Sequence, residues 1–137
     1  MKNVEHIGIA VRDLEAAEKL FGTLFNSEPY KKETIASELV ETSFFKINQT
    51  KIELLKATNA ESAIAKFIEK KGEGFHHVAF EVDDIISEME RLKGQGFILL
   101  NEHPKPGADN KLVCFLHPKG TNGMLIELCQ EIRKPDH

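Results

Sequence analysis

The sequence has few of the features that mark specialised classes of protein. Its 137 residues include no tryptophan, one tyrosine and two cysteines, Cys114 and Cys129. Two cysteines are too few for a disulfide framework, so we expect both to be buried free thiols. The 18 basic and 22 acidic side chains give a net charge of -4. This balance excludes the strongly basic surface that nucleic-acid binding requires, so no nucleic-acid partner is expected.

Long apolar runs are also missing. Runs such as residues 7–11 fall far short of the roughly 20 residues of a membrane-spanning helix, and the first residues lack the apolar stretch of a secretory signal. The hydrophobic share of 41% and the charged share of 29% are those of an ordinary globular protein. We therefore expect a soluble, cytoplasmic protein without a membrane partner, folded as a single domain over residues 1–137.

The chain repeats itself about halfway along its length. The segment HIGIAVRDL, which begins at His6, matches HVAFEVDDI, which begins at His77. A second pair of segments, KIELL around Glu53 and LIELC around Glu127, closes the two halves in the same order. Because two matched segments recur at nearly equal spacing, we interpret the chain as an internal duplication.

Both halves show the same order of expected elements. Polarity that alternates with a period of two predicts strands, and apolar residues at helical spacing predict helices. In the first half this gives a strand over 3–11, a helix from Asp13, and strands over 28–35, 40–47 and 50–57. The second half repeats the order over 75–82, 84–94, 96–101, 111–117 and 123–130. We therefore predict an α+β fold of two βαβββ modules, residues 3–57 and 75–130, linked by a helix over 59–71.

Two histidines and two glutamates occupy matching positions in the repeats: His6 and Glu53 in the first, His77 and Glu127 in the second. Taken singly, each would be interpreted as a surface or structural side chain. The sheet is expected to curl into a half-barrel, with the four converging on its concave face beside small neighbours. A buried carboxylate costs several kcal/mol unless a cation compensates its charge. Two imidazoles and two carboxylates therefore predict a divalent metal site, for Co²⁺, Mn²⁺, Ni²⁺, Zn²⁺ or Fe²⁺.

These segments resemble the vicinal oxygen chelate superfamily over about residues 3–130. Within it, FLHPKGTNGMLIEL at 115–128, preceded by PKPGA at 104–108, is similar to the methylmalonyl-CoA epimerases. The resemblance implies paired βαβββ modules, often in a dimer, and one divalent metal in each active site. It also implies an acyl-CoA substrate, epimerised through a metal-stabilised enolate at the carbon between thioester and carboxylate. The implied metal ligands are His6, Glu53, His77 and Glu127.

Inversion at that carbon needs two acid–base groups, one on each face. The resemblance makes Glu127 the first candidate. Glu41 is the nearest match to the second, although a surface residue of a strand needs no function. Coenzyme A is anionic, and Lys105, Lys111 and Lys119 are candidates for contacts with it.

Two other functions fit the same fold. A glyoxalase I type lyase, acting on a glutathione hemithioacetal, would use the same four ligands. Such lyases carry an arginine four residues after the first ligand histidine, where this chain has Ala10, and this difference counts against a lyase. A non-catalytic binding protein of this fold needs no ligands on the concave face, so the complete set favours an enzyme. The sequence therefore predicts a homodimeric, metal-dependent epimerase and leaves the identity of the metal open.

Overall fold

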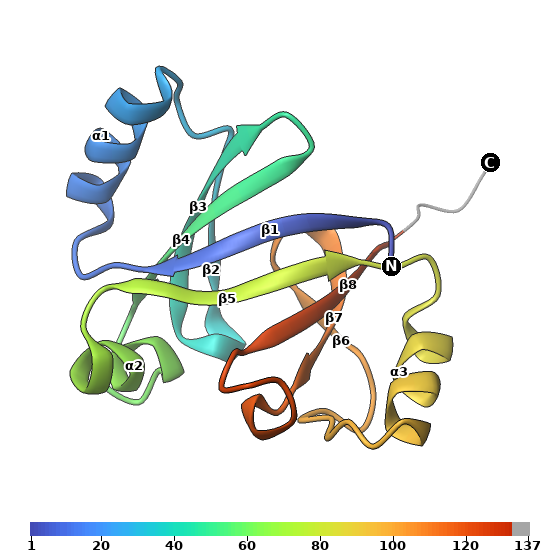
Figure 1. Cartoon of the computed structure of the whole chain (residues 1–137). Helices are drawn as coiled ribbons and strands as arrows, with labels where there is room; N and C mark the ends of the chain where they lie inside the picture. The colour runs from blue at the N-terminus through green and yellow to red at the C-terminus, as the bar shows by residue number, and fades with distance from the viewer. Residues whose placement is uncertain (133–137) are drawn as a thin grey trace. The chain divides into compact units, whose positions relative to one another are not determined.

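Each repeat of the sequence forms one strand, one helix and three further strands in the computed structural model, which describes residues 1–132 (Figure 1). The chain divides into two units. The N-terminal unit comprises residues 6–76, and the C-terminal unit comprises residues 1–5 together with the chain from His77 onward. The α+β class and the βαβββ order predicted from the sequence are confirmed.

The N-terminal unit contains three whole strands and residues 6–10 of a fourth, β1, in the order β2-β3-β4-β1. Strand β1 pairs with β4 in parallel, and the other pairs are antiparallel. Asn48 begins the two-residue turn between β3 and β4 with a left-handed φ of 57°, a conformation that asparagine tolerates well. The strands are β1 (Asn3–Ala10), β2 (Lys31–Ile35), β3 (Val40–Ile47) and β4 (Thr50–Ala57).

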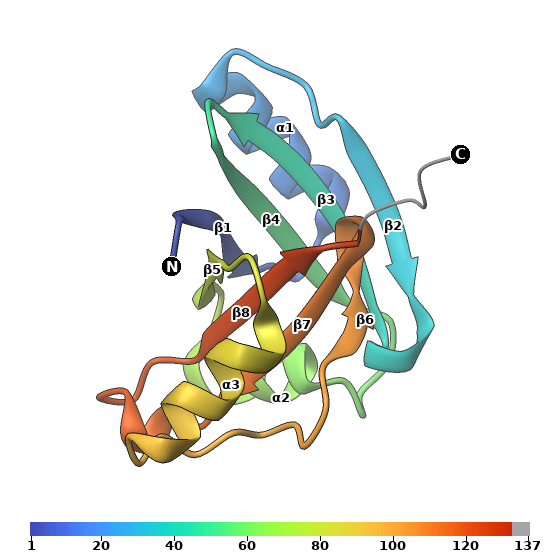
Figure 2. The same cartoon turned by 90° about the vertical axis from the view of Figure 1, so that its right-hand side faces the viewer.

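Helices α1 (Leu14–Phe25) and α2 (Ala63–Lys71) pack on opposite faces of this sheet. Helix α1 begins after Asp13, whose carboxylate accepts a hydrogen bond from the Ala16 amide, and it lies along β3 and β4 (Figure 2). Its apolar side packs on one face, while α2 packs on part of the other face. Because neighbouring residues of a strand point to opposite faces, the two helices meet different side chains: Phe45 and Leu54 for α1, Val40 and Leu55 for α2.

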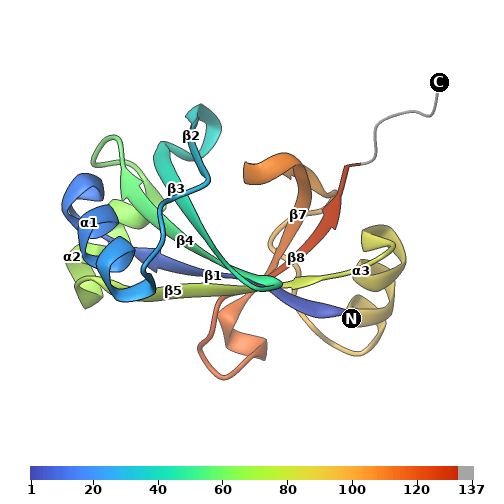
Figure 3. The ribbon, with the colours of Figure 1, turned by 90° about the horizontal axis from the view of Figure 1, so that it is seen from above.

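The C-terminal unit repeats the arrangement with strands in the order β5-β8-β7-β6. Its helix α3 (Ile85–Gly94) begins after Asp84, which caps it, and packs beside β7 and β8 (Figure 3). The apolar side of α3 meets Cys114, Leu116 and Leu128 on one face of the sheet. The strands are β5 (Gly74–Glu81), β6 (Lys105–Gly107), β7 (Lys111–Leu116) and β8 (Ile126–Glu131).

Two expectations about individual elements differ from the structure. Residues 96–101 do not form a strand; only Leu99 makes an isolated bridge, to Leu116, and the second strand of the module is β6 instead. Pro106 has no amide hydrogen and is tolerated in β6 because this is an edge strand. The helix expected over 59–71 begins at Ala63, because the Ser62 hydroxyl caps it. No helix within residues 1–132 combines the length and the apolar character of a membrane-spanning segment.

Candidate metal centre

In the N-terminal unit, His6 on β1 and Glu53 on β4 form a buried pair. Gly8 lies directly opposite Glu53 in the parallel register, and His6 is two residues earlier on the same face. The Nε2 atom of His6 is 3.5 Å from Oε1 of Glu53, and the side chains are only 7% and 5% exposed. Gly8 has no side chain and so places no bulk of its own beside the carboxylate.

In the C-terminal unit, His77 on β5 and Glu127 on β8 form an equivalent pair. Ala79 lies opposite Glu127, and His77 is again two residues earlier. The distance from His77 Nε2 to Glu127 Oε1 is 3.4 Å, and the side chains are 4% and 6% exposed. The duplication therefore preserves the strand pairing, the small neighbour and the distance between donor atoms.

These distances fit two ligands of one ion better than a hydrogen bond. An N–H···O hydrogen bond has a donor–acceptor distance of about 2.9 Å. Two donor atoms that each lie about 2.1 Å from one ion, at the tetrahedral angle, are about 3.4 Å apart. Each unit thus presents one imidazole nitrogen and one carboxylate oxygen with the spacing and chemistry that divalent ions of this class bind.

An aromatic ring lies beside the second pair. Phe115 on β7 is directly opposite Glu127, and its ring centroid is 6.0 Å from that of His77 in an edge-to-face arrangement. The Lys105 ammonium lies 5.9 Å from the centroid of the same ring. We expect these contacts to limit the rotation of the His77 imidazole.

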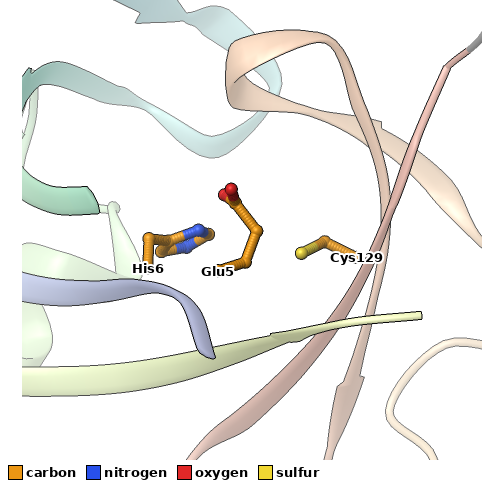
Figure 4. Close-up of side chains that lie close together, drawn as sticks. All are labelled: Glu5, His6 and Cys129. Carbon is orange, nitrogen blue, oxygen red and sulfur yellow. The ribbon is translucent and has the colours of Figure 1, made fainter. Parts of the chain in front are cut away.

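Two buried groups near the pairs were not singled out from the sequence. Glu5 on β1 is buried, and the Cys129 sulfur points towards it (Figure 4). Burial raises the pKa of the Cys129 thiol, and the Glu127 and Glu5 carboxylates raise it further, while Lys111 opposes them. The thiol therefore stays protonated and is a poor nucleophile. The sequence does not predict Glu5 near the pairs. Glu5 and His6 are consecutive residues of one strand, and strict alternation would place their side chains on opposite faces of the sheet.

Thr42 on β3 is the second such group. It is fully buried, and its hydroxyl is the one buried side-chain polar atom in the described chain that has no hydrogen-bond partner. It is paired with Leu55, on the face that carries Glu53. An unsatisfied buried hydroxyl costs about 1–3 kcal/mol, so it is an atom that a bound ligand or water molecule would stabilise.

Glu41, the other acidic candidate, lies on the opposite face of the same sheet. Its neighbours along β3 on that face are Ser43 and Phe45, and Phe45 packs under α1. The Glu41 carboxylate is 33% exposed and lies 3.4 Å from Lys32 Nζ. The structure therefore does not bring Glu41 together with Glu53.

Comparisons with known proteins agree with this architecture. Residues 5–115 match the family model described as the glyoxalase/bleomycin resistance protein/dioxygenase superfamily. The chain is 41% identical over 129 residues to the ethylmalonyl-CoA/methylmalonyl-CoA epimerase of Cereibacter sphaeroides, covering 93% of this chain and 96% of that protein. It is 37% identical over 128 residues to the mitochondrial methylmalonyl-CoA epimerase of Homo sapiens, covering 93% of this chain and 73% of that protein.

A solved structure gives the same result. A methylmalonyl-CoA epimerase variant of Streptomyces coelicolor, in complex with 2-nitronate-propionyl-CoA, matches with a TM-score of 0.94 and 30% sequence identity. The match covers 97% of this chain and 99% of that one. The resemblance and the fold class predicted from the sequence are thereby confirmed.

Proposed function

Since the chain belongs to the glyoxalase/bleomycin resistance protein/dioxygenase superfamily, we propose that it is a methylmalonyl-CoA epimerase that works with a divalent metal. The substrate class follows from the relatives, which are named as epimerases of methylmalonyl-CoA. The match to each of them covers nearly the whole length of this chain. The proposed metal ligands are His6, Glu53, His77 and Glu127.

The observation that carries the metal proposal is the equality of the two pairs. Each has a histidine two residues before a small residue that faces a glutamate, with donor atoms 3.5 and 3.4 Å apart. A metal held by both modules would draw one pair from each, so this proposal accounts for the retention of the same two residue types and the same register in both copies. Two such pairs would supply four ligands, two nitrogen and two oxygen donors, and this mixture suits a divalent ion.

The chemistry requires removal of the acidic proton next to the thioester on one face and delivery of a proton by a second donor on the other face. A bound divalent ion supplies Lewis-acid stabilisation of the negative charge that develops. Glu127 is the proposed proton acceptor, because its carboxylate is nearly excluded from water and is held by a strand with neighbours on both sides. Glu41 receives no role in this proposal, because it lies on the α1 side of its sheet.

The structure gives no support to the glyoxalase I type alternative. The position that carries an arginine in those lyases is Ala10, which is fully buried. It packs in the cluster of Val40, Leu55 and Ile64, so the chain has neither the cation nor an open position for it there.

Proton exchange at the reacting carbon tests the proposal. Methylmalonyl-CoA is incubated with the protein in D₂O, with chelator or with Co²⁺ added back, and followed by NMR. We expect metal-dependent incorporation of deuterium together with loss of configurational purity. Exchange no faster than the background, in protein shown to hold metal, would refute the epimerase proposal. The Glu127→Gln variant should fold and bind acyl-CoA but lose exchange; substantial exchange would remove Glu127 from the role of proton acceptor.

The proposal also includes the homodimer and the cytoplasmic location predicted from the sequence. Light scattering coupled to size-exclusion chromatography checks the first, since a dimer has twice the 15.4 kDa mass of the chain. Fractionation of cells that express the tagged protein checks the second.

A further inference from the structure

The Thr42 hydroxyl on β3 is buried in the N-terminal unit without a hydrogen-bond partner among the described residues. Burial has removed it from water, and an unsatisfied buried hydroxyl destabilises a fold. The next residue, Ser43, is equally buried, but its hydroxyl points to the other face and donates a hydrogen bond to Oε2 of Glu18, at 3.0 Å. Valine has the shape of threonine without the hydroxyl, so packing alone gives no reason for a threonine at this position.

Thr42 lies close along the sheet to the proposed metal ligand Glu53. Leu55 is directly opposite Thr42, and Phe44 is directly opposite Glu53. Thr42 and Glu53 are therefore diagonal neighbours on one face of the β3–β4 pair. The Cβ atoms of diagonal neighbours are about 7–8 Å apart or somewhat less, a distance that a long side chain bridges. A glutamate side chain has this length.

His6 and Thr42 lie on opposite sides of Glu53 along β4. His6 is level with Lys51, two residues before Glu53, and its Nε2 is 3.5 Å from Oε1 of the carboxylate. Thr42 is level with Leu55, two residues after Glu53. A carboxylate that binds an ion through one oxygen keeps the other for a hydrogen-bond donor, and such donors orient metal ligands. The hydroxyl is thus on the side of Glu53 away from His6, where a donor of this kind is needed.

The C-terminal unit carries a valine at the matching position. Thr42 precedes by two residues the phenylalanine that lies opposite Glu53. In the second unit, Val113 precedes by two residues the phenylalanine that lies opposite Glu127. Val113 packs in an apolar cluster of its own unit. The βαβββ module therefore folds without a hydroxyl at this position, and the threonine is a departure from the repeat.

We propose that Thr42 is a positioning residue of the metal site, and that its hydroxyl donates a hydrogen bond to the Glu53 carboxylate when an ion is bound there. The inference rests on the proposed function, because that proposal makes Glu53 a metal ligand. In the metal-free protein the unsatisfied hydroxyl is destabilising, and in the loaded protein it stabilises a charged ligand. Thr42 therefore lowers the stability of the metal-free fold and raises the affinity for the ion.

The variant Thr42→Val, which gives the first copy the residue type of the second, tests both effects. Calorimetric titration with Co²⁺ should show binding at least about 10-fold weaker than that of wild type, the loss expected when a donor to a metal ligand is removed. Urea denaturation with chelator should show a higher midpoint for the variant, because the unsatisfied hydroxyl is gone. Thr42→Ser keeps the hydroxyl and should bind Co²⁺ within about twofold of wild type.

The matched control is Ser43→Ala, which removes a buried hydroxyl from the next residue of the same strand, on the other face. This variant loses the hydrogen bond to Glu18. It should therefore unfold at a lower urea concentration than wild type and bind Co²⁺ with unchanged affinity.

Unchanged Co²⁺ affinity in Thr42→Val would overturn the inference. A lower urea midpoint with chelator would also overturn it, because the hydroxyl would then have a partner in the metal-free protein, as would equal losses of affinity in the valine and serine variants. If Thr42→Val does not fold, as judged by circular dichroism, Thr42→Ala removes the same hydroxyl and the Co²⁺ titration decides. Wild-type protein that binds no Co²⁺ would instead overturn the metal proposal itself. Wild-type protein that binds Co²⁺ without catalysing exchange would overturn the epimerase proposal alone.

Discussion

Replacing Glu53 with glutamine should stabilise the metal-free protein and weaken its binding of metal. The Glu53 carboxylate is almost fully buried on β4, beside the imidazole of His6. Burying a carboxylate is expensive, and glutamine keeps the same shape without the charge. The free energy of unfolding of the metal-free variant should therefore exceed that of wild type by about 1–3 kcal/mol.

The effect on metal binding has the opposite sign. Glutamine offers a neutral carbonyl oxygen where glutamate offers a charged ligand, so the attraction for a divalent ion falls. Loss of a group that only orients a ligand typically costs about 10–100-fold in metal affinity, and loss of a ligand charge should reach at least the upper end of this range. Opposite changes in stability and affinity are characteristic of a binding site and are not expected from a structural ion pair.

Two measurements at pH 8 check this prediction. Urea denaturation in the presence of chelator, followed by circular dichroism, gives the free energy of unfolding, and calorimetric titration with Co²⁺ gives the dissociation constant. Glu41→Gln is the matched control, because this carboxylate lies in the same sheet on the opposite face and is one-third exposed. It should change stability by less than about 0.5 kcal/mol and leave Co²⁺ binding unchanged. The reasoning is wrong if Glu53→Gln destabilises the metal-free protein, or binds Co²⁺ as wild type does.

Three further predictions concern the parts of the fold that hold the site. Leu54→Ala removes a fully buried side chain under α1 and should reduce the free energy of unfolding, measured by urea denaturation, by about 2–5 kcal/mol. The control Leu24→Ala changes an exposed residue of α1 and should alter this free energy by less than about 0.5 kcal/mol. Hydrogen bonds from the backbone and side chain of Ser87 lower the pKa of Asp84, so its stabilising effect is complete above the ordinary carboxyl pKa and is lost as pH falls through the lowered value. Asp84→Ala should accordingly be less stable than wild type at pH 7 in thermal unfolding, with the difference vanishing in strong acid. Burial raises the pKa of both cysteine thiols, so iodoacetamide at pH 8 should label neither in the folded protein and both in urea, as read by mass spectrometry.

The pairing within each unit was predictable because two sequence signals agree. Alternation with a period of two placed each histidine on the same face as the small residue two positions later. The duplication then indicated that whatever lies beside His6 has a counterpart beside His77. Both pairs, His6 with Glu53 and His77 with Glu127, are found at contact distance within their units. Neither signal alone predicts which strand lies beside the histidine. The repeat narrows the choice, because the same pairing of histidine with glutamate must be possible in both halves of the sequence.

The face of Glu41 could not be predicted from local sequence, because it depends on register. Strand β3 is a mixture of apolar and polar residues on both faces, with Thr42, Ser43, Phe44 and Phe45 all buried in succession. A shift of one residue in the turn at Asn48 would exchange the two faces. The second strand of the second module, expected over 96–101, was wrong for a different reason. Its apolar residues Phe97 and Leu99 pack against the α3 cluster without pairing in a ladder.

The two copies of the module have diverged unequally along the face that carries each glutamate. Around each glutamate the surroundings are equivalent: a small residue on one side, a phenylalanine on the other and a histidine two residues along. Farther along the same face the copies differ, since the first packs Val40 under α2 while the second carries Lys111. The proposal that each copy supplies one histidine and one glutamate as metal ligands accounts for this equivalence. The proposed substrate has two different ends, so the residues that contact it have no reason to be the same in the two copies.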